Sequence, residues 1–330
     1  MDAMRRILIF LALLPVFAQS PSDRIGTIDF YGYGHLDLAA LRAALPFKEG
    51  DKVPAGGARD RDLQAVNRIA GRKALFSGVC CLEDGRSSIY IGLPEIDAPP
   101  LAFNPQPQGD ARLPASAMGI LRGFEDDFSK AVKRGAAGED DSQGYALFED
   151  PATHADQLKL LAWTRGHLPI VLKVLQESRD ARQRAYAAQA LGYAERSPEQ
   201  IAALVTAAFD SDDDVRNNGM RALQALCAPG KEVASQIPAA RFVPLLHSID
   251  WTDRNKGAML FDRMTVGRDP AILKLLHDQA LEPLREMAQW KDFGHAWFAI
   301  RILGRIGGIE ESRLDSLSPA MVPEILRAAQ

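Results

Sequence analysis

A pattern that recurs four times in the second half of the chain constrains the fold most. Each copy has a small residue three positions after its first residue and a large apolar residue seven positions after it. The copies begin at Arg184, Arg216, Arg254 and Ala296, at intervals of 32, 38 and 42 residues. Intervals of this length are typical of stacked helical hairpins. The sequence therefore predicts a helical repeat array.

The spacing has a direct physical meaning on a helix. Positions three and seven residues apart share a face, so the small residue allows close helix contact while the apolar residue fills the core. The positions that set this register are Arg184, Arg216, Arg254, Gly219, Gly257, Leu191, Leu223 and Leu303. An apolar helix is expected before each copy, at 168–175, 201–209, 242–249 and 272–287. The expected N-caps of the second helices are Asp180, Asp212 to Asp214, Thr252 or Asp253, and Asp292.

The repeat resembles those of HEAT-repeat proteins over about residues 155–330. The resemblance rests on Asp210, six residues before Arg216, and on the run Ala190-Leu191-Gly192. It implies an α-solenoid, and in that family the Asp at this spacing ties neighbouring repeats together. Serines stand at the matching positions of two other repeats, Ser178 and Ser248. Because solenoids are generic binding scaffolds, the resemblance implies an architecture and no particular reaction.

The first third of the chain has a different pattern. Residues 25–31 alternate as a short strand that ends at Gly32, and two stretches with helical spacing follow. Two β-rich runs then flank Asp84-Gly85, which is a strong signal for a hairpin. We expect a small α+β domain with the order β-α-α-β-β over residues 25–96.

This order resembles a POTRA (polypeptide-transport-associated) domain. The residues that carry the resemblance are Ile25, Ile28, Phe30, Leu38, Leu41, Gly50, Asp51, 75–79 and 89–95. In that family the domain pairs extended polypeptide along an exposed sheet edge or mediates assembly in the cell envelope. The resemblance implies a similar role here. The alternative is a small domain that only packs on the rest of the chain.

The expected fold class is mainly α, with a C-terminal α-solenoid of helical-hairpin repeats preceded by the small α+β domain. A proline-rich linker is expected over 97–116, where little periodic apolar content remains. A helical connector is expected over 117–153, with a solvated turn at Glu139-Asp140-Asp141-Ser142. The repeat domain then covers 154–330.

The first eighteen residues have the pattern of a secretory signal. Arg5 and Arg6 precede an apolar run over 7–14, and small residues follow before the expected cleavage after Ala18. The run is too short to span a bilayer. We therefore expect residues 1–18 to be a signal peptide and the protein to be exported, either periplasmic or secreted.

Charge and hydropathy narrow the class of partner. Without Asp2, Arg5 and Arg6 the chain carries 37 Lys+Arg against 42 Asp+Glu, a formal net charge of −5. This acidic balance lacks the basic surface expected for a protein that binds nucleic acid or anionic lipid. No later segment reaches eighteen consecutive apolar residues. We expect a protein or peptide partner, no nucleic acid, and no stable membrane insertion of the mature chain. The sequence does not predict the oligomeric state.

The three cysteines are Cys80, Cys81 and Cys227. Adjacent residues on a strand point to opposite faces, so Cys80 and Cys81 are expected to be small buried hydrophobes, with a strained vicinal disulfide as the alternative. The sequence does not decide their redox state or that of Cys227.

Catalytic, cofactor-binding and metal-binding motifs are absent from the sequence. The six histidines are scattered, and no pair has the spacing of two metal ligands on one helix face. No nucleophile elbow, phosphate-binding glycine loop or dinucleotide fingerprint occurs. We therefore expect a non-enzymatic protein with no cofactor and no metal. The histidines are His35, His154, His167, His247, His277 and His295.

The second helices of a solenoid commonly line its concave surface, and helical geometry indicates which side chains point there. The predicted binding residues are Asn217, Arg221, Gln224, Asn255, Met259, Trp251, Trp297 and Arg301. We expect a shallow groove with amide and guanidinium groups and an exposed aromatic ring at Trp297, suited to peptide recognition. The amides of Asn217 and Asn255 have two interpretations. They either bond across the stack or bind the backbone of a ligand.

Three functions remain open from sequence. The first is an exported scaffold or adaptor that binds protein or peptide through the concave face of the solenoid. The second is a ligand-binding protein or enzyme with its site between the N-terminal domain and the solenoid, where His154 or His167 would meet carboxylates. The third is peptide capture along the sheet edge of the N-terminal domain.

Overall fold

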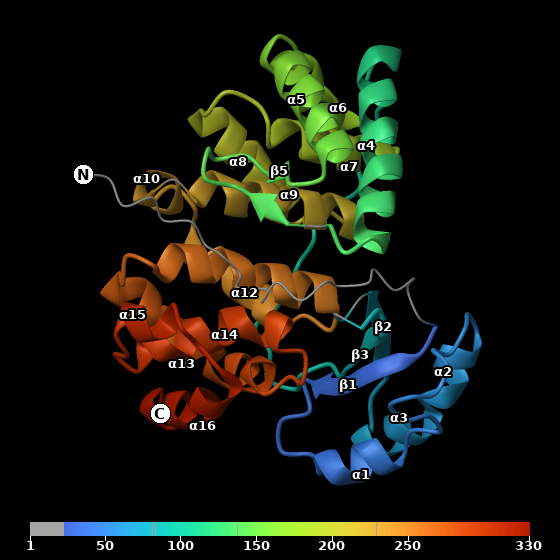
Figure 1. Ribbon diagram of the computed structural model, residues 1–330, viewed down its shortest axis with the longest axis vertical. Coiled ribbons are helices and arrows are strands. Elements are labelled where there is room, and N and C mark those ends of the chain that lie inside the picture. The colour runs from blue at the N-terminus through green and yellow to red at the C-terminus, as the bar shows by residue number, and fades with distance from the viewer. Residues whose placement is uncertain (1–22, 81, 83, 137, 229) are drawn as a thin grey trace.

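The computed structural model describes residues 23–80, 82, 84–136, 138–228 and 230–330. The predicted signal segment 1–18 and Cys81 lie outside the described residues. Within the described part of the chain, no helix is both long and apolar enough to cross a membrane. The protein is mainly helical, with a three-stranded sheet near its N-terminus (Figure 1).

The N-terminal part folds as an α+β unit, which we call the N-terminal module. Its elements are β1 (Ile25–Tyr31), α1 (Leu38–Ala43), α2 (Ala58–Asp62), α3 (Gln64–Ala70), β2 (Leu75–Cys80) and β3 (Ser87–Gly92). β3 is the central strand, parallel to β1 and antiparallel to β2. The β2–β3 hairpin around Asp84-Gly85 is therefore confirmed. The short helix α2 is an addition to the expected order.

The rest of the chain is a helical solenoid whose helices pack in pairs (Figure 1). Its first elements are α4 (Ala115–Lys133), β4 (Glu139–Asp140), β5 (Leu147–Phe148), α5 (Pro151–Arg165), α6 (Leu168–Glu177), α7 (Ala181–Leu191), α8 (Pro198–Ala207) and α9 (Asp213–Cys227). The later ones are α10 (Lys231–Ala234), α11 (Ala239–Phe242), the 3₁₀ helix η1 (Val243–His247), α12 (Trp251–Thr265), α13 (Pro270–Ala288), α14 (Phe293–Ile306), α15 (Glu311–Leu314), the 3₁₀ helix η2 (Pro319–Met321) and α16 (Val322–Ala328).

The repeat register holds in the packing. The apolar side chains at the seventh position are fully buried at Leu191, Leu223, Phe261 and Leu303. At Gly219 an added Cβ atom would lie 2.9 Å from the Ala207 Cβ atom, so α9 and α8 approach closely there. In this repeat the small residue at the third position therefore allows the close approach of the two helices.

The third repeat departs from the expectation in its first helix. An α-helix was expected over 242–249, but α11 ends at Phe242 and a 3₁₀ turn follows. Pro244 lies inside this turn and has no amide hydrogen, which disfavours a continuous α-helix.

The helix caps agree with the sequence at three positions and differ at one. The carboxylates of Asp180, Asp212 and Asp292 accept backbone amide hydrogens at the starts of α7, α9 and α14. The cap of α12 is Asp250, and the expectation of Thr252 or Asp253 is wrong. The helix begins at Trp251, so Asp253 lies inside its first turn and is free to bind another repeat.

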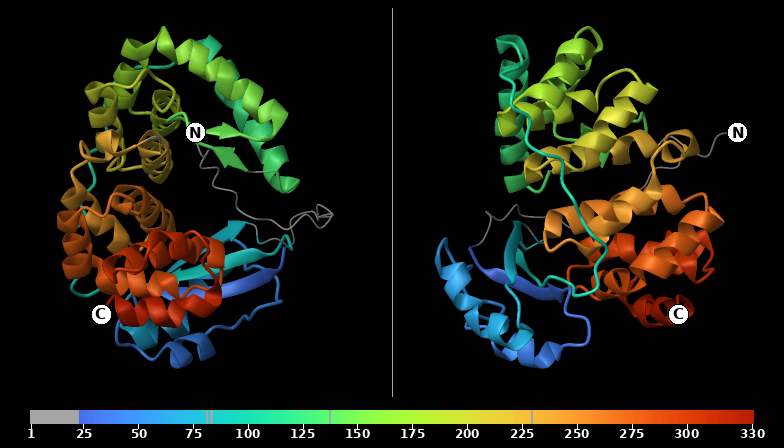
Figure 2. Two further views of the ribbon diagram at one scale, coloured as in Figure 1. Left: turned by 60° about the vertical axis from the view of Figure 1, so that its left-hand side comes forward. Right: turned by 180° about the vertical axis from the view of Figure 1, so that it is seen from behind.

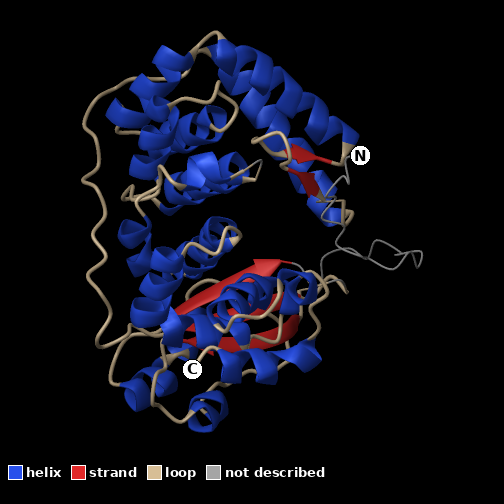
Figure 3. Ribbon diagram, turned by 90° about the vertical axis from the view of Figure 1, so that its left-hand side faces the viewer, coloured by secondary structure: helices blue, strands red, loops and turns tan. Residues whose placement is uncertain are grey.

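The solenoid forms an arc, and the N-terminal module lies beside its C-terminal helices (Figures 2 and 3). The stretch between β3 and α4 therefore runs back along the outside of the arc to reach α4 (Figure 2, right). It is held at the loop after α8, at the loop before α7 and on α7 itself. Asn104 N donates to Phe209 O (2.6 Å), Arg179 N donates to Gly109 O (2.8 Å), and Leu113 N donates to Gln183 Oε1 (2.8 Å). These bonds attach the stretch to the repeats around α7 and α8.

Buried arginines tie one repeat to the next. Each one donates to the carbonyl oxygen six residues earlier, as Arg184 does to Ser178 O at 2.8 Å. Arg184 also pairs with Asp210, whereas Arg216 pairs with Asp253. Arg254 pairs with Glu95 of the module at 2.6 Å, and Glu286 of α13 lies farther away, at 3.7 Å. The module thus supplies the acid for the last arginine of the series.

Aromatic and polar side chains fill the junction between the module and the solenoid. The Tyr90 ring of β3 stacks on Trp251 of α12 at 5.2 Å and packs on Trp290 at 4.9 Å. Tyr31 donates its hydroxyl hydrogen to Ile249 O at 2.6 Å. The Glu286 carboxylate accepts from the amides that follow β1, at Gly32 and Gly34. The module is therefore packed as part of the solenoid's end.

Candidate functional site

The candidate site is the side of α9 and α12 that faces the interior of the arc, which we call the inner face. The short β4–β5 ribbon lies against it, inside the arc (Figures 2 and 3). Arg221 of α9 forms an ion pair with Glu139, and Arg263 of α12 forms one with Asp141 at 2.5 Å. Glu139, Asp140 and Ser142 are exposed, as a solvated turn at 139–142 implies, whereas Asp141 is half-buried. Asp140 Oδ1 accepts from the Ser142 amide.

The ribbon has one anchored strand and one exposed strand. Phe148 of β5 is buried and packs on the Phe128 ring at 4.8 Å, and its amide donates to Gln157 Oε1 at 2.7 Å. Both residues of β4 are exposed. Arg221 spans the two strands, because its guanidinium also lies 4.9 Å from the centre of the Phe148 ring. Apolar packing therefore fixes β5, whereas exposed ion pairs hold β4 and the residue after it.

The predicted binding residues on α9 have two environments. Asn217 and Arg221 are half-buried, so they remain partly accessible. Gln224 is buried, and the expectation that it points into an open groove is wrong. Its Nε2 atom donates to Lys256 O at 3.1 Å, and Asn218 Nδ2 donates to Ala185 O at 3.0 Å. Gln224 and Asn218 thus bond across the stack, whereas Asn217 Nδ2 lies 3.4 Å from Asn218 Oδ1 on the same helix.

The α12 residues are more enclosed than expected. Asn255 is buried, its Nδ2 atom lies 3.8 Å from Met259 Sδ, and its Oδ1 atom has no hydrogen-bond partner among the described residues. Met259 is half-buried. The sequence placed Asn255 outward from helical phase alone, which takes no account of α9 and α14, the neighbouring helices that pack on α12.

The remaining predicted residues lie away from the inner face or are engaged elsewhere. Trp251 is buried at the junction against Tyr90, so its expected place beside an open row is wrong. Trp297 is half-buried and meets the Phe293 ring edge-on at 5.7 Å. Arg301 pairs with Asp262, Glu311 and Asp315, an arrangement that joins α14 to α12 and α15.

Two cations on the inner face were not among the predicted residues. Lys256 and Arg263 are seven residues apart on α12 and therefore share one face. Burial and the Arg221 guanidinium lower the pKa of Lys256 to about 8, against the opposing effect of Glu139. The seven-residue spacing was visible in the sequence. The acidic partners of this face are more than eighty residues earlier in the chain, and no local pattern connects them to it.

A second polar cluster lies at the junction. Asp292 Oδ2 accepts from Ser88 Oγ at 2.8 Å and lies 3.0 Å from His295 Nδ1, which is 2.6 Å from the Tyr90 hydroxyl. Ser88 is buried, so its hydroxyl is not accessible to a substrate as a nucleophile. The arrangement caps α14 and attaches β3 to it.

The histidines singled out for an enzyme site have structural contacts. His154 Nδ1 lies 2.9 Å from Phe148 O, and His167 Nδ1 lies 2.7 Å from Trp163 O. No ion pair joins either of them to a carboxylate among the described residues. The free thiol of Cys227 is buried, which raises its pKa to about 12 and keeps it protonated at neutral pH.

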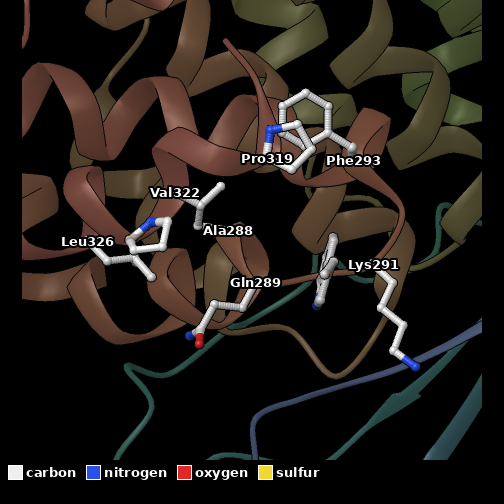
Figure 4. A pocket seen from close by; sticks show the side chains of 9 residues that line it. Ala288, Gln289, Lys291, Phe293, Pro319, Val322 and Leu326 are labelled. Carbon is white, nitrogen blue, oxygen red and sulfur yellow. The ribbon is translucent and has the colours of Figure 1, made fainter.

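Two further features could be taken for sites. An open depression of about 600 Å³ lies by α16, lined mostly by apolar side chains such as Phe293, Val322 and Leu326, with Lys291 pointing away from the others (Figure 4). Three carboxylates whose oxygens lie within 4.8 Å of one another gather at the start of α9. One of them, Asp212, caps that helix. Neither feature presents converging groups for catalysis.

Comparison with known proteins adds little to this geometry. No family model matches the chain, and no curated protein matches it. A crystal structure of an engineered protein from the Northeast Structural Genomics Consortium is similar at 18% sequence identity and a TM-score of 0.40. The similarity covers 64% of this chain and 94% of that one. A likeness this weak carries no functional argument.

Proposed function

We propose that this protein is a non-enzymatic scaffold or adaptor that binds a protein or peptide through the inner face of its solenoid. One observation carries the proposal. The inner face already holds a short extended segment of its own chain, through Arg221 and Arg263. Side chains that bind an extended segment in this way can bind the same chemistry in a partner, because backbone and carboxylate groups are common to all polypeptides.

The architecture supports a more specific assignment. We infer that the repeats are HEAT-like, because the buried arginines form a series of contacts between successive repeats. The series differs from the pattern of that family in where the acidic partners lie. The partner of Arg216 is Asp253, inside a helix, and the partner of Arg254 is Glu95, in the module. We also infer that the module is POTRA-like, on the order of its strands and helices and on its central β3 strand.

The proposal places the protein outside the cytoplasm, in the periplasm or secreted. It relies here on the basic, apolar and small-residue pattern of residues 1–18. In this setting the partner would be an envelope or secreted protein. The proposal includes no cofactor.

Capture of the partner tests the function. The mature protein, starting at Gln19, is the bait in a cell-envelope extract, beside the variants Asn217→Glu and Met259→Glu, which place a negative side chain on the inner face. Gln176→Glu on the exposed surface of α6 is the control. We expect at least one protein to be captured by the wild type and the control and lost from both inner-face variants. A partner retained by both inner-face variants, or no partner at all, contradicts the proposal. Thermal unfolding shows that each variant is folded.

A second candidate is strand addition at β2. The outer edge of β1 is occupied, because Ile25 N donates to Asp51 O and Gly50 N donates to Ile25 O. β2 is the other edge of the sheet. The amides of Ser87, in β3, and of Leu93, just after it, donate toward β1, so the residues between them that alternate with these bond to β2. The amides of their partners in β2 therefore point inward, and the amides of Phe76 and Gly78 point away from the sheet. Gly78→Pro removes one outward amide. Loss of the partner in this variant, with the inner-face variants unaffected, favours β2 as the binding edge.

A further inference from the structure

The inner face matches an acidic segment in spacing as well as in charge. Glu139 and Asp141 are two residues apart, and side chains at this spacing on an extended chain point to the same side, about 7 Å apart. Their two partners, Arg221 and Arg263, come from neighbouring helices. Asp140, between them, is exposed and turns to the Ser142 amide. The contact therefore selects two carboxylates at alternate positions of an extended segment.

The inner face also contains Lys256, which forms no ion pair with this segment. Lys256 lies two helical turns before Arg263 on the same face of α12. No carboxylate of the described residues lies within ion-pair distance of its ammonium group, which lies 3.7 Å from Met259 Sδ. Burial and the Arg221 charge lower the pKa of this lysine, against the opposing effect of Glu139. A longer acidic ligand would pair more of the cations than the internal segment does.

The internal segment is held in a way that allows displacement. The ion-paired side chains are each about one quarter to one third exposed, and ion pairs that accessible to water are individually weak. β4 has two residues and pairs with β5 alone. Phe148 fixes β5 in the core, so β4 can leave the inner face while the fold remains intact.

We propose that Arg221, Lys256 and Arg263 form a binding site for an acidic, extended segment of a partner protein, and that Glu139 and Asp141 occupy this site in the free protein. The proposal rests on the proposed function and adds the chemical class of the partner and a built-in competitor. A partner segment with carboxylates at alternate positions displaces β4. The net negative charge of the chain, −4, argues against a nucleic acid as the ligand.

Fluorescence anisotropy tests the proposal with a defined ligand. The probe is a fluorescein-labelled synthetic peptide with the sequence of residues 138–149, titrated with the purified protein. In the variant Glu139→Gln/Asp141→Asn the internal competitor is lost. If that competitor occupies the site about nine-tenths of the time in the wild type, the variant binds the peptide about tenfold more tightly. Adding Arg221→Gln/Arg263→Gln to this variant should abolish binding.

Matched controls separate the site from general charge effects. Glu125→Gln/Asp127→Asn removes two acids at the same spacing on α4 and should leave the affinity of the wild type unchanged. A peptide with Gln and Asn at the two acidic positions should bind no variant. The proposal is overturned if the acid-loss variant binds no more tightly than the wild type, if binding survives loss of the arginines, or if a single-stranded oligonucleotide binds as well as the peptide.

The two proposals fail in different ways. If a captured partner depends on Asn217 and Met259 but the peptide distinguishes none of the variants, the inner face binds a partner of other chemistry and only this inference fails. If the peptide behaves as expected and no protein is captured through the inner face, the site exists and the proposed function fails.

Discussion

Arg254 of α12 donates a 2.6 Å hydrogen bond to the Glu95 carboxylate, although 159 residues separate them in the chain. The Arg254 side chain is completely buried and lies 4.6 Å from the centre of the Tyr31 ring, so the N-terminal module supplies both an acid and an aromatic ring to the guanidinium. His247 also contacts Glu95, with Nδ1 at 2.5 Å from the carboxylate. The module therefore completes the series of arginine contacts and stabilises the end of the solenoid.

The first prediction concerns this contact. Glu95→Ala leaves the buried Arg254 guanidinium with Glu286, 3.7 Å away, as its remaining carboxylate. Removing one member of a buried ion pair costs about 3 kcal/mol, because the other charge stays desolvated. We expect the free energy of unfolding in urea to fall by about this amount. The matched control is Glu324→Ala, which removes an exposed acid paired with Arg313 and should change stability little. Equal effects of the two variants would show that Glu95 is not a structural link.

The second prediction concerns the small residue at the third position of each repeat. In Gly219→Ala the new Cβ atom would lie 2.9 Å from Ala207 Cβ and 3.2 Å from Ala208 N, so α8 and α9 must move apart. We expect a loss of about 1–3 kcal/mol in the free energy of unfolding.

Gly257→Ala is the internal comparison for that prediction. Its new Cβ atom would lie 3.4 Å from Leu245, which is ordinary contact. The variant should gain up to about 1 kcal/mol from helix propensity. A loss at Gly257 as large as that at Gly219 would contradict the geometry.

The third prediction concerns pH. Asp29 is buried on β1. Burial raises its pKa to about 6, although the hydrogen bond from the Lys291 amide and the charge of Arg42 act to lower it. Between about pH 4 and pH 6 the native protein keeps a proton that the unfolded chain has released, so stability falls as pH rises through this window. At the upper end of this pH window, the free energy of unfolding has fallen by about 3 kcal/mol because of Asp29.

Asp29→Asn should remove this slope. Urea unfolding of the wild type and the variant at pH 4.5 and pH 7 gives the difference due to Asp29 alone, because all other acids are common to both. We expect the variant to gain about 2 kcal/mol relative to the wild type between these pH values. Parallel pH profiles would mean that Asp29 is ionised throughout.

The fourth prediction concerns export. A chain expressed with its own N-terminus in a secreting bacterial host should be recovered outside the cytoplasm with Gln19 as its first residue. Intact mass spectrometry measures this directly. Replacing Leu11 and Leu13 with Lys interrupts the apolar run and should leave the uncleaved chain in the cytoplasm. Recovery of an unprocessed chain in both cases would contradict a cleaved signal.

The repeats could be predicted from the sequence because helical period fixes them locally. Arg216, Gly219 and Leu223 fall three, four and seven residues apart, and only a helix puts them on one face. The caps Asp180 and Asp292 follow from the same local rules. The cap of α12 was missed by two or three residues, since Asp250, Thr252 and Asp253 are all good caps and only packing selects among them.

The long-range contacts could not be predicted in this way. Nothing near Glu95 indicates that the chain folds back so that this residue meets Arg254. The same holds for Glu139 and Arg221, which are 82 residues apart. Trp251 illustrates the limit of prediction from helical periodicity. The periodicity gives the direction of its side chain, but it does not reveal that the Tyr90 ring covers it.

The central claim is that the inner face of the solenoid contacts a polypeptide partner. Site-specific photo-crosslinking in the source cells tests it most directly, with a photoreactive phenylalanine analogue in place of Asn217, Lys256 or, as a control, Gln176 on α6. We predict that the analogue at 217 and at 256 crosslinks to the same partner protein and that the analogue at 176 does not. Crosslinks to that partner from 176 alone, or from all three positions equally, would contradict the claim.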